Sequence, residues 1–286
     1  MLEQKFHNYL KKQKLEKIVI MLSQTLIIML FFGLWELLSK YHIINSFIFS
    51  SPSMIIKTII NLLIKGHLIA HIFVTLKEIL IAFSLGIAIS LVIAILMYEL
   101  PLLAKIIEPF LTIINSLPKV ALGPIIIIWF GANELSIIVM ALLINLIVST
   151  LTIYNGLKEV DPNQILLLKS LRASQYDILT TLVLKSASNS IISSLKLNIS
   201  MTLIGVIMGE FLVSKAGIGY LIIYGTQIFN LNIVMSGIII LVLLSYFLYL
   251  IITIYEKNSI NKWYYFIYYK TSYHFYKNNN QLMNLY

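Results

Sequence analysis

Cysteine is absent from the 286-residue chain. Its absence excludes disulfide bonds, metal–thiolate sites and a cysteine nucleophile, but it leaves the cellular compartment open. Charged residues are also scarce: they make up 12% of the sequence, whereas 59% is hydrophobic. A soluble domain carries about 25% charged residues. This composition therefore indicates a membrane protein with several spans.

Signatures of enzyme sites are missing as well. No G-x-x-x-x-G-K-[ST] loop occurs, so the chain has no P-loop site for ATP, and H-E-x-x-H and G-x-S-x-G are absent too. His67 and His71 have the i,i+4 spacing of a helical metal pair, but no carboxylate partner is evident and a solvated helix face is favoured. We expect no enzyme activity and no metal or cofactor bound by this chain.

Arginine is nearly absent, since Arg172 is the single arginine, yet lysines give a net charge of +9. Cytoplasmic loops of membrane proteins carry excess Lys and Arg, which explains this charge better than a nucleic-acid partner does. The apolar run at residues 18–38 is longer than a signal-peptide core and has no A-x-A-like cleavage site, so we expect an uncleaved first span.

Hydropathy predicts an all-α polytopic membrane protein. We expect six spans, at about 18–38, 74–98, 107–130, 135–154, 189–213 and 232–254. Residues 1–17 are expected to form a basic cytoplasmic N-terminus, 18–257 the six-span domain, and 258–286 an aromatic and basic cytoplasmic tail. Its aromatic side chains suit the level of the lipid headgroups, and a dispensable appendage is favoured. The Ser51-Pro52 pair predicts the start of an amphipathic surface helix. Basic residues are most frequent in the segments that face the cytoplasm if both termini do, which predicts that orientation in the cell membrane.

Two features of the spans concern helix geometry. Pro118 and Pro124 interrupt the third span in "SLPKVALGPIIIIWFG", because proline removes a backbone donor and kinks a helix. A broken membrane helix marks a transport path or is an ordinary kink, and both interpretations stay open. Gly205 and Gly209 form a small-xxx-small pair that permits close approach of another helix.

Polar residues inside membrane spans are costly and are therefore candidates for function. Lys119, Asn145 and Glu210 are candidates to line a translocation path, with helix–helix hydrogen bonding as an equal alternative. Lys119 would attract an anionic solute or extend its ammonium toward water. Glu78 is expected to pair with Lys77 at the membrane edge.

A half-polar segment, "EVDPNQILLLKSLRASQYDILTTLVLKSA" (159–187), separates the fourth and fifth spans. Asp161-Pro162 predicts a helix start, and "RASQ" predicts the junction of two short helices. An apolar face is expected to rest on the membrane domain, formed by Ile165, Leu168, Leu171, Tyr176, Leu179, Leu182 and Val183. Lys169, Arg172, Gln175 and Asp177 are expected to face outward. Such an elbow suits docking into a groove on a partner, although a surface hairpin without a partner is the alternative.

Four stretches in order resemble a known family: "SLPKVALGPIIIIWFGANELS" (116–136), "YNGLKEVDP" (154–162), "SLRASQYDIL" (170–179) and "GEFLVSKAGIGYLI" (209–222). They are similar to the inner-membrane permease subunits of ABC importers, of the nitrate/sulfonate/taurine type, a group that includes permeases for thiamine and riboflavin precursors. The similarity runs from about residue 50 to 257, with the family core at about 70–255.

The resemblance implies a type I ABC importer permease fold and a coupling loop at 158–186 that sits in a cleft of a separate ATP-binding subunit. The family's Glu-Ala-Ala motif falls on Leu166, Leu167 and Leu168, and its glycine falls on Arg172. Arginine there must take a backbone angle that glycine adopts freely, or strain it. The ATPase contact is expected at Leu171, Arg172, Ala173, Ser174, Gln175, Tyr176 and Asp177.

The resemblance also implies partners and cargo. The expected assembly is a permease homodimer with two ATPase subunits, which bind ATP and magnesium, and an extracytoplasmic solute-binding protein, all within membrane lipid. The solute is expected to be small and anionic or heterocyclic. An ion-gradient-driven secondary transporter is the alternative, but it predicts paired intramembrane acids or an inverted repeat, and the sequence shows few such acids and no clear repeat.

Overall fold

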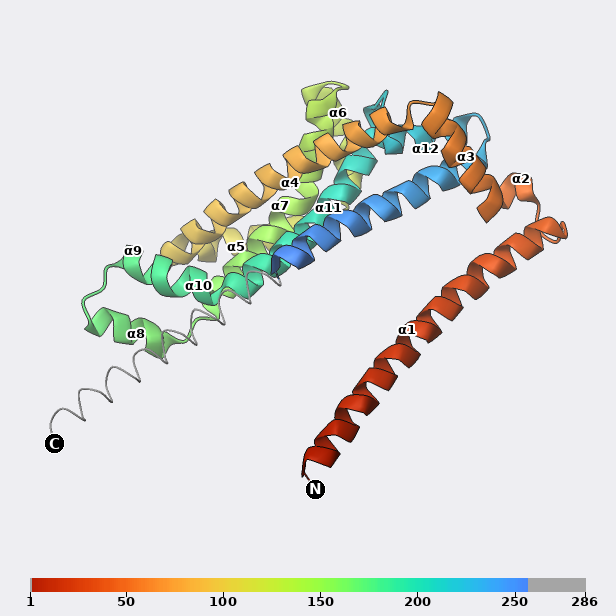
Figure 1. The fold of residues 1–286 in the computed structure, drawn as a ribbon. Coiled ribbons are helices and arrows are strands. Elements are labelled where there is room, and N and C mark those ends of the chain that lie inside the picture. Colours follow the sequence, from red (N-terminus) through yellow and green to blue (C-terminus); the bar gives the residue numbers. More distant parts are fainter. Residues whose placement is uncertain (1, 257–286) are drawn as a thin grey trace. The chain divides into compact units, whose positions relative to one another are not determined.

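Every regular element in the computed structural model is helical over residues 2–256, the part of the chain that the structure describes (Figure 1). This confirms the predicted all-α class. The predicted tail at 258–286 lies outside the described residues. In chain order the elements are α1 Leu2–Lys40, α2 Ser46–Phe49, α3 Pro52–Lys65, α4 Leu68–Glu99, α5 Pro101–Ser116, a 3-10 turn Lys119–Leu122, α6 Gly123–Phe130, α7 Glu134–Lys158, α8 Pro162–Ser170, α9 Gln175–Ile178, a π-helical turn Leu179–Val183, α10 Leu184–Ser186, α11 Ser188–Val213, α12 Ile218–Gln227 and a last helix Leu231–Glu256.

Five of the described helices are long and apolar enough to cross a membrane, and a bent pair makes a sixth. The five are Lys11–Lys40, Leu68–Glu99, Glu134–Lys158, Ser188–Val213 and Leu231–Glu256. Each contains one of the predicted spans. The first helix, however, begins at Leu2 rather than near residue 18, because no proline or glycine interrupts the chain before Gly33.

The third predicted span is not one kinked helix. Its halves, Pro101–Ser116 and Lys119–Phe130, are bent by 88°. Leu117 takes extended angles, φ −71° and ψ 143°, as the residue before a proline prefers. Pro124 lies near the start of α6, where its missing N–H has no helical partner to lose. Pro118 therefore marks the break, and Pro124 fits the new helix start.

Contacts divide the chain into two compact units, Met1–Ile69 with Leu221–Ile239, and Ala70–Tyr220 with Ile240–Tyr286. In the first unit, the predicted Ser51-Pro52 helix start is present: the Ser51 side chain accepts a hydrogen bond from Met54 N–H at 3.3 Å. Glu36 of α1 accepts a hydrogen bond from Ser53 N–H at 3.0 Å. Ser50 donates to Asn232 at 2.7 Å, which ties the start of α3 to the last helix.

In the second unit, α7 and α11 lie side by side and form the centre of a bundle. Ile79 and Ala82 of α4, Ile137 and Ala141 of α7, and Val206 of α11 form one buried apolar cluster there. Leu248 and Ile252 close it from the last helix. Dispersion contacts and small residues, rather than the hydrophobic effect, hold helices together where lipid surrounds them.

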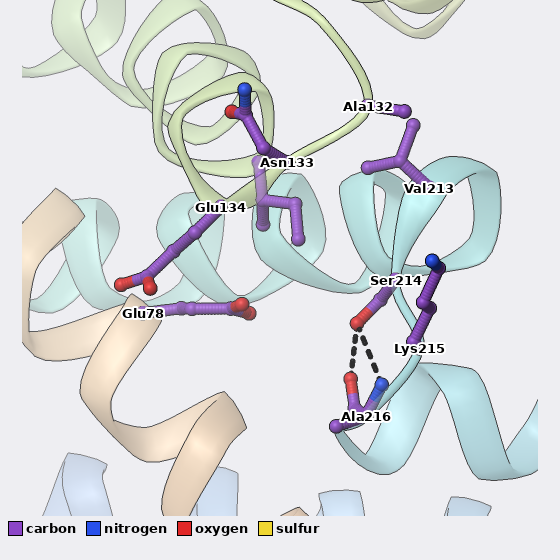
Figure 2. Close-up of a pocket in the computed structure, with 9 residues that line it drawn as sticks. Glu78, Ala132, Asn133, Glu134, Val213, Ser214, Lys215 and Ala216 are labelled. Carbon is purple, nitrogen blue, oxygen red and sulfur yellow. Dashed lines mark hydrogen bonds between the residues drawn. The ribbon is translucent and has the colours of Figure 1, made fainter.

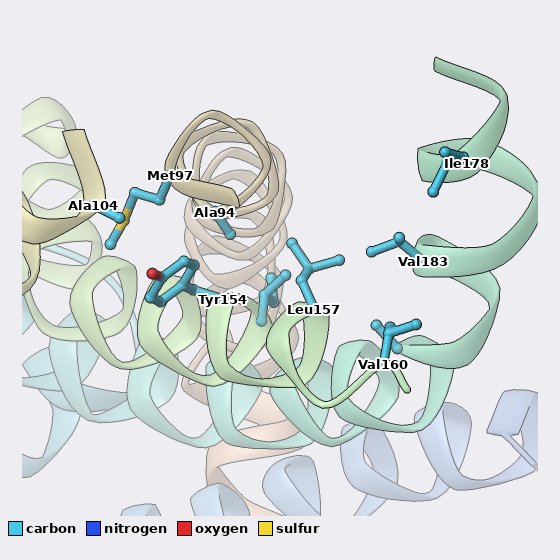
Figure 3. Packing of buried hydrophobic residues seen from close by; sticks show 10 residues of the cluster. Ala94, Met97, Ala104, Tyr154, Leu157, Val160, Ile178 and Val183 are labelled. Atoms are coloured by element: carbon cyan, nitrogen blue, oxygen red, sulfur yellow. The ribbon is translucent and has the colours of Figure 1, made fainter. Parts of the chain in front are cut away.

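A second apolar cluster anchors the segment between α7 and α11 (Figure 3). Ala94 and Met97 of α4 meet Leu157 of α7 in it. Ile178, at the end of α9, and Val183, in the π-helical turn that follows, pack into the same cluster and are 5% and 0% exposed. The elbow is thus attached to the bundle by buried side chains at its second half.

Candidate functional site

The first half of the predicted coupling loop is α8, which ends in a hydrogen-bonded reversal. Ala173 N–H donates to Leu168 O at 3.0 Å, and Arg172 N–H donates to Lys169 O at 2.9 Å. This pair of bonds defines a Schellman motif, in which the residue after the helix cap takes left-handed angles and is usually glycine.

Arg172 occupies that left-handed position with φ 60°. The family has a glycine at this position. Arg172 adopts the left-handed backbone angle that glycine takes freely, as one of the two predicted outcomes required. The left-handed region is disfavoured for a residue with a Cβ atom by about 1–2 kcal/mol. The Schellman bonds and the anchored second half of the loop hold it there.

The second half begins with a capping box at α9. The Ser174 hydroxyl accepts a hydrogen bond from Asp177 N–H at 3.1 Å, and the Asp177 carboxylate accepts one from Ser174 N–H at 3.1 Å. The Ser174 hydroxyl also donates to that carboxylate at 2.6 Å. These hydrogen bonds from the Ser174 side chain and backbone lower the pKa of Asp177 below its ordinary value. The capping box fixes where the second helix starts.

Burial corrects part of the predicted apolar face. Ile165 and Leu168 are partly buried against the bundle, as expected, but Leu171 and Tyr176 are 70% and 72% exposed. Leu171 lies in the reversal and Tyr176 in the first turn of α9, so the 3.6-residue period does not continue across the junction. Ile178, which the periodicity missed, takes the buried place.

Exposed apolar side chains therefore gather on the elbow. Leu166 and Leu167 are 63% and 61% exposed, in addition to Leu171 and Tyr176. Lys169, Arg172, Gln175 and Asp177 are exposed beside them, as predicted. In Figure 1, α8 and α9 lie at one end of the α7–α11 pair, and α6 lies at the other end. This surface, formed by α8, the Schellman turn and α9, is called the elbow surface below.

Asn145, a predicted path residue, lies fully buried between helices. Its Nδ2 donates to Thr202 Oγ1 at 2.6 Å and is 3.4 Å from Asn198 Oδ1. Asn198 in turn donates to Ser149 Oγ at 2.9 Å. The network joins α7 to α11, as expected for hydrogen bonding between helices. Within the described residues, Asn145 Oδ1 is buried without a hydrogen-bond partner, and the role of Asn145 toward a solute stays a prediction.

The glycines of α11 lie against α7. A Cβ on Gly209 would lie 2.9 Å from Ile137 Cα, and one on Gly205 would collide with Ala141 Cα at a still shorter distance. Both distances are too short for a packed side chain, so the two backbones approach as closely as a small-xxx-small pair permits.

Glu210, another predicted path residue, is 1% exposed and caps the start of α12. Its Oε2 accepts a hydrogen bond from Gly219 N–H at 2.5 Å, and its Oε1 accepts one from Thr75 Oγ1 at 2.6 Å. The first N–H groups of a helix have no partner within the helix, and a carboxylate there is favoured by the helix dipole. The sequence analysis missed α12, since it assigned no element between the predicted spans 189–213 and 232–254.

Two residues of α4 complete this cap. Ile218 N–H donates to Thr75 Oγ1 at 2.8 Å, and Gly217 N–H donates to His71 Nδ1 at 3.0 Å. Gly217 has φ 114°, and a Cβ on it would collide with the Glu210 carboxylate. His71 was expected on a solvated face; its i,i+4 spacing to Thr75 instead places both acceptors on one face of α4.

Glu78 does not pair with Lys77. Lys77 forms an ion pair with Glu134 at 2.8 Å, whereas Glu78 is 3% exposed and lies one turn after Thr75, which donates to Glu210. Glu78 also lines a pocket of about 270 Å³ with Ala132, Asn133, Glu134, Ile137, Val213, Ser214, Lys215 and Ala216 (Figure 2). The prediction failed because neighbouring residues on a helix point in different directions.

Lys119, the third predicted path residue, is half-buried at the break between α5 and α6. Its ammonium donates to Asn115 Oδ1 at 2.9 Å and to Asn115 O at 3.3 Å. It thus satisfies a carbonyl near the end of α5, and its role toward a solute stays a prediction.

Comparison with known proteins agrees with this architecture. Residues 86–260 match the family model described as binding-protein-dependent transport system inner membrane component. A chain of the MetNI methionine ABC transporter, solved in inward-facing conformations, aligns with a TM-score of 0.54 at 17% identity and covers 65% of this chain and 92% of its own. At that identity the likeness concerns the fold.

Curated relatives are ABC importer permeases. SsuC of Bacillus subtilis, a candidate aliphatic sulfonates permease, is 24% identical over 73% of this chain and 75% of its own. The formylaminopyrimidine permease ThiX of Halalkalibacterium halodurans is 26% identical over 70% and 79%. The taurine permease TauC of Escherichia coli is 20% identical over 75% and 80%.

The family match covers more than half of the chain. The bent third span, the elbow, α7 and α11 lie within the matched residues, and α4 begins before them. The chain is a multi-pass inner-membrane protein and belongs to the binding-protein-dependent transport system inner membrane components, the permease subunits of ABC importers of the sulfonate/taurine type.

Proposed function

We propose that this permease takes its driving force from a separate ATPase subunit, which docks on the elbow surface. The observation that supports this most is the exposure of Leu166, Leu167, Leu171 and Tyr176 on two short helices and the turn between them, which are themselves anchored to the bundle. Exposed apolar side chains ringed by charged ones are typical of a surface that another protein covers.

Coupling requires that the ATPase hold the elbow differently in its two states, because a partner with equal affinity for both shifts nothing. The helix α7 runs without a break from Glu134 to Lys158, directly before the elbow. At 1.5 Å per residue its 25 residues extend about 37 Å. A displacement of the elbow can therefore reach the far end of the bundle through one rigid element. ATP and magnesium are bound by the partner.

The proposed assembly is a permease homodimer with two ATPase subunits and a solute-binding protein on the extracytoplasmic side. Both termini face the cytoplasm, as the distribution of lysines indicates. The helix α1 exposes apolar side chains on all its faces between Val19 and Leu34, which fits contact with membrane lipid. The names of the relatives favour a small sulfonate or a pyrimidine precursor as solute.

Purification tests the coupling directly. The tagged chain, extracted gently from its native membrane, should bring down a P-loop ATPase. Arg172→Glu should weaken that association about tenfold, as loss of a charge contact at an interface does. Lys57→Glu is the matched control, since it reverses an exposed charge on α3, outside the loop. Equal ATPase recovery with both variants would remove the elbow from the interface.

Uptake measurements test the energy source. Solute uptake should stop when ATP is depleted and persist when ion gradients are collapsed. The opposite pattern would identify a gradient-driven carrier and contradict the proposed function.

A further inference from the structure

Glu78 and Glu210 form a buried acid pair inside the second unit. The two side chains are 3% and 1% exposed. Thr75, one turn before Glu78 on the same face of α4, donates to Glu210 at 2.6 Å, and Glu78 lines one pocket with Val213 and Ser214, which follow Glu210 by one turn of α11. The two acids therefore face each other between α4 and α11. Neither forms an ion pair within residues 2–256, where Lys77 is occupied by Glu134. Two carboxylates that face each other away from water repel strongly, so such a pair requires a proton or another cation.

Hydrogen-bond directions assign the roles of the two acids. Both oxygens of Glu210 already accept hydrogen bonds, from Thr75 and from Gly219. The Thr75 hydroxyl has a single hydrogen, and it accepts from Ile218 N–H, so its own hydrogen is committed to Glu210. Glu210 therefore acts as the acceptor of the pair.

Within residues 2–256, Glu78 Oε2 is out of contact with solvent and has no hydrogen-bond partner. As a carboxylate, Glu78 would be a buried, uncompensated charge, which is among the costliest arrangements in a protein. As a neutral acid it has an O–H that can donate to Glu210.

We propose that Glu78 is a positioning residue that holds a proton against Glu210 and so keeps the Glu210 carboxylate on the start of α12. The proton exchanges with water through the pocket beside Glu78 (Figure 2). When it leaves, two negative charges face each other, Glu210 is displaced, and the N–H groups of Gly219 and its neighbours lose their cap. The start of α12 is thus held while Glu78 keeps its proton and loosens as the pH rises.

Other titratable groups surround the pair without taking the place of the proton. His71 and Tyr220 stack on each other at 5.8 Å, and His71 Nδ1 is an acceptor for Gly217 N–H. Lys77 and Glu134 balance each other in their ion pair. Figure 2 shows Lys215 on the opposite side of the pocket from Glu78.

Two substitutions separate a donor role from a charge role. Glu78→Gln keeps the shape and supplies an amide N–H donor that does not titrate, whereas Glu78→Leu has no donor. Hydrogen exchange at residues 217–220 of the purified protein in nanodiscs is the measurement. In the wild type, exchange should accelerate about tenfold to a hundredfold as the pH rises, beyond the intrinsic pH effect, as expected for losing a hydrogen bond to a charged group.

Glu78→Gln should keep this segment protected at every pH, and Glu78→Leu should leave it unprotected throughout. Infrared spectroscopy gives an independent signature: the carbonyl band of a protonated carboxyl should vanish in Glu78→Gln and remain in Glu134→Gln, which removes an acid from the same pocket. If Glu78→Gln exchanges as fast as the wild type at high pH, or if no such band is lost, Glu78 acts as a carboxylate and the proposal is overturned. None of these measurements requires the ATPase, so their outcome is independent of the proposed coupling.

Discussion

Two of the residues with left-handed backbone angles form turns at the ends of the bundle. Arg172 turns the chain at the elbow with φ 60°, and Gly217 turns it before α12 with φ 114°. Gly217 adopts its angle without steric cost because it has no Cβ atom, whereas the left-handed angle is unfavourable for Arg172. The two sites give opposite expectations for substitution.

At the elbow, Arg172→Gly should stabilise the purified permease by about 1 kcal/mol, because glycine removes the cost of the left-handed angle. The thermal unfolding midpoint in detergent should rise. Lys169→Gly, at a helical position of the same turn, should lower it by a similar free energy. A fall with Arg172→Gly as large as that with Lys169→Gly would show that the angle is unstrained.

Before α12, Gly217→Ala should destabilise the protein, because its Cβ meets the Glu210 carboxylate and the angle is left-handed. A loss of at least about 1–2 kcal/mol is expected from the angle alone. Gly33→Ala is the control, since a Cβ there has nothing within 4 Å. Folded yield and unfolding midpoint in detergent are the readouts, and equal behaviour of the two variants would contradict the cap geometry.

The role of a residue was predictable from the sequence where its interactions are with residues close to it in the chain. The family's glycine position at Arg172 signalled a special angle, and the angle is there. Glu78 was misplaced because its neighbour Lys77 suggested a pair, although adjacent helical residues point about 100° apart. Two acceptors of the α12 cap, Thr75 and His71, lie on α4, 143 and 146 residues from their donors, so no local pattern predicted them.

Among the elements, α9 begins with a reciprocal capping box between Ser174 and Asp177. The pKa of Asp177 is lowered by the hydrogen bonds from Ser174, so the cap contributes fully above the ordinary aspartate pKa of about 4 and is lost as the pH falls through the lower folded-state value. At neutral pH the elbow is therefore fully capped.

Titration of the Asp177 carboxyl by NMR should show this lowered pKa, and Ser174→Ala should return it toward the ordinary range. The same substitution should speed hydrogen exchange in residues 175–178 at neutral pH, because the first turn of α9 loses its partner. An unchanged titration in Ser174→Ala would show that the cap is not formed in solution.

Helix starts with a capping residue or proline were predictable: the Ser51-Pro52 start of α3 and the Asp161-Pro162 start of α8 are both present. The right-angled break at Pro118 was predicted only as an interruption, because proline fixes a backbone angle but tertiary packing sets the bend. The π-helical turn Leu179–Val183 also had no sequence signal.

At the scale of the whole molecule, hydropathy was enough to place the spans, since a bilayer dictates their length. The family match ends at residue 260. Deletion of residues 260–286 should therefore leave transport intact. Uptake by the truncated chain at normal protein level is the measurement, and lost uptake at that level would show that the tail has a function.

One more consequence follows from the turn at Arg172. Because it is the single arginine of the chain and lies exposed between two short helices, an arginine-specific protease has one cleavage site, between the fourth and fifth spans. Cleavage there would split the permease into two membrane fragments that the α7–α11 contact holds together. A docked subunit would cover Arg172 and slow this cleavage. The cleavage rate would therefore measure occupancy of the elbow surface in the unlabelled native chain.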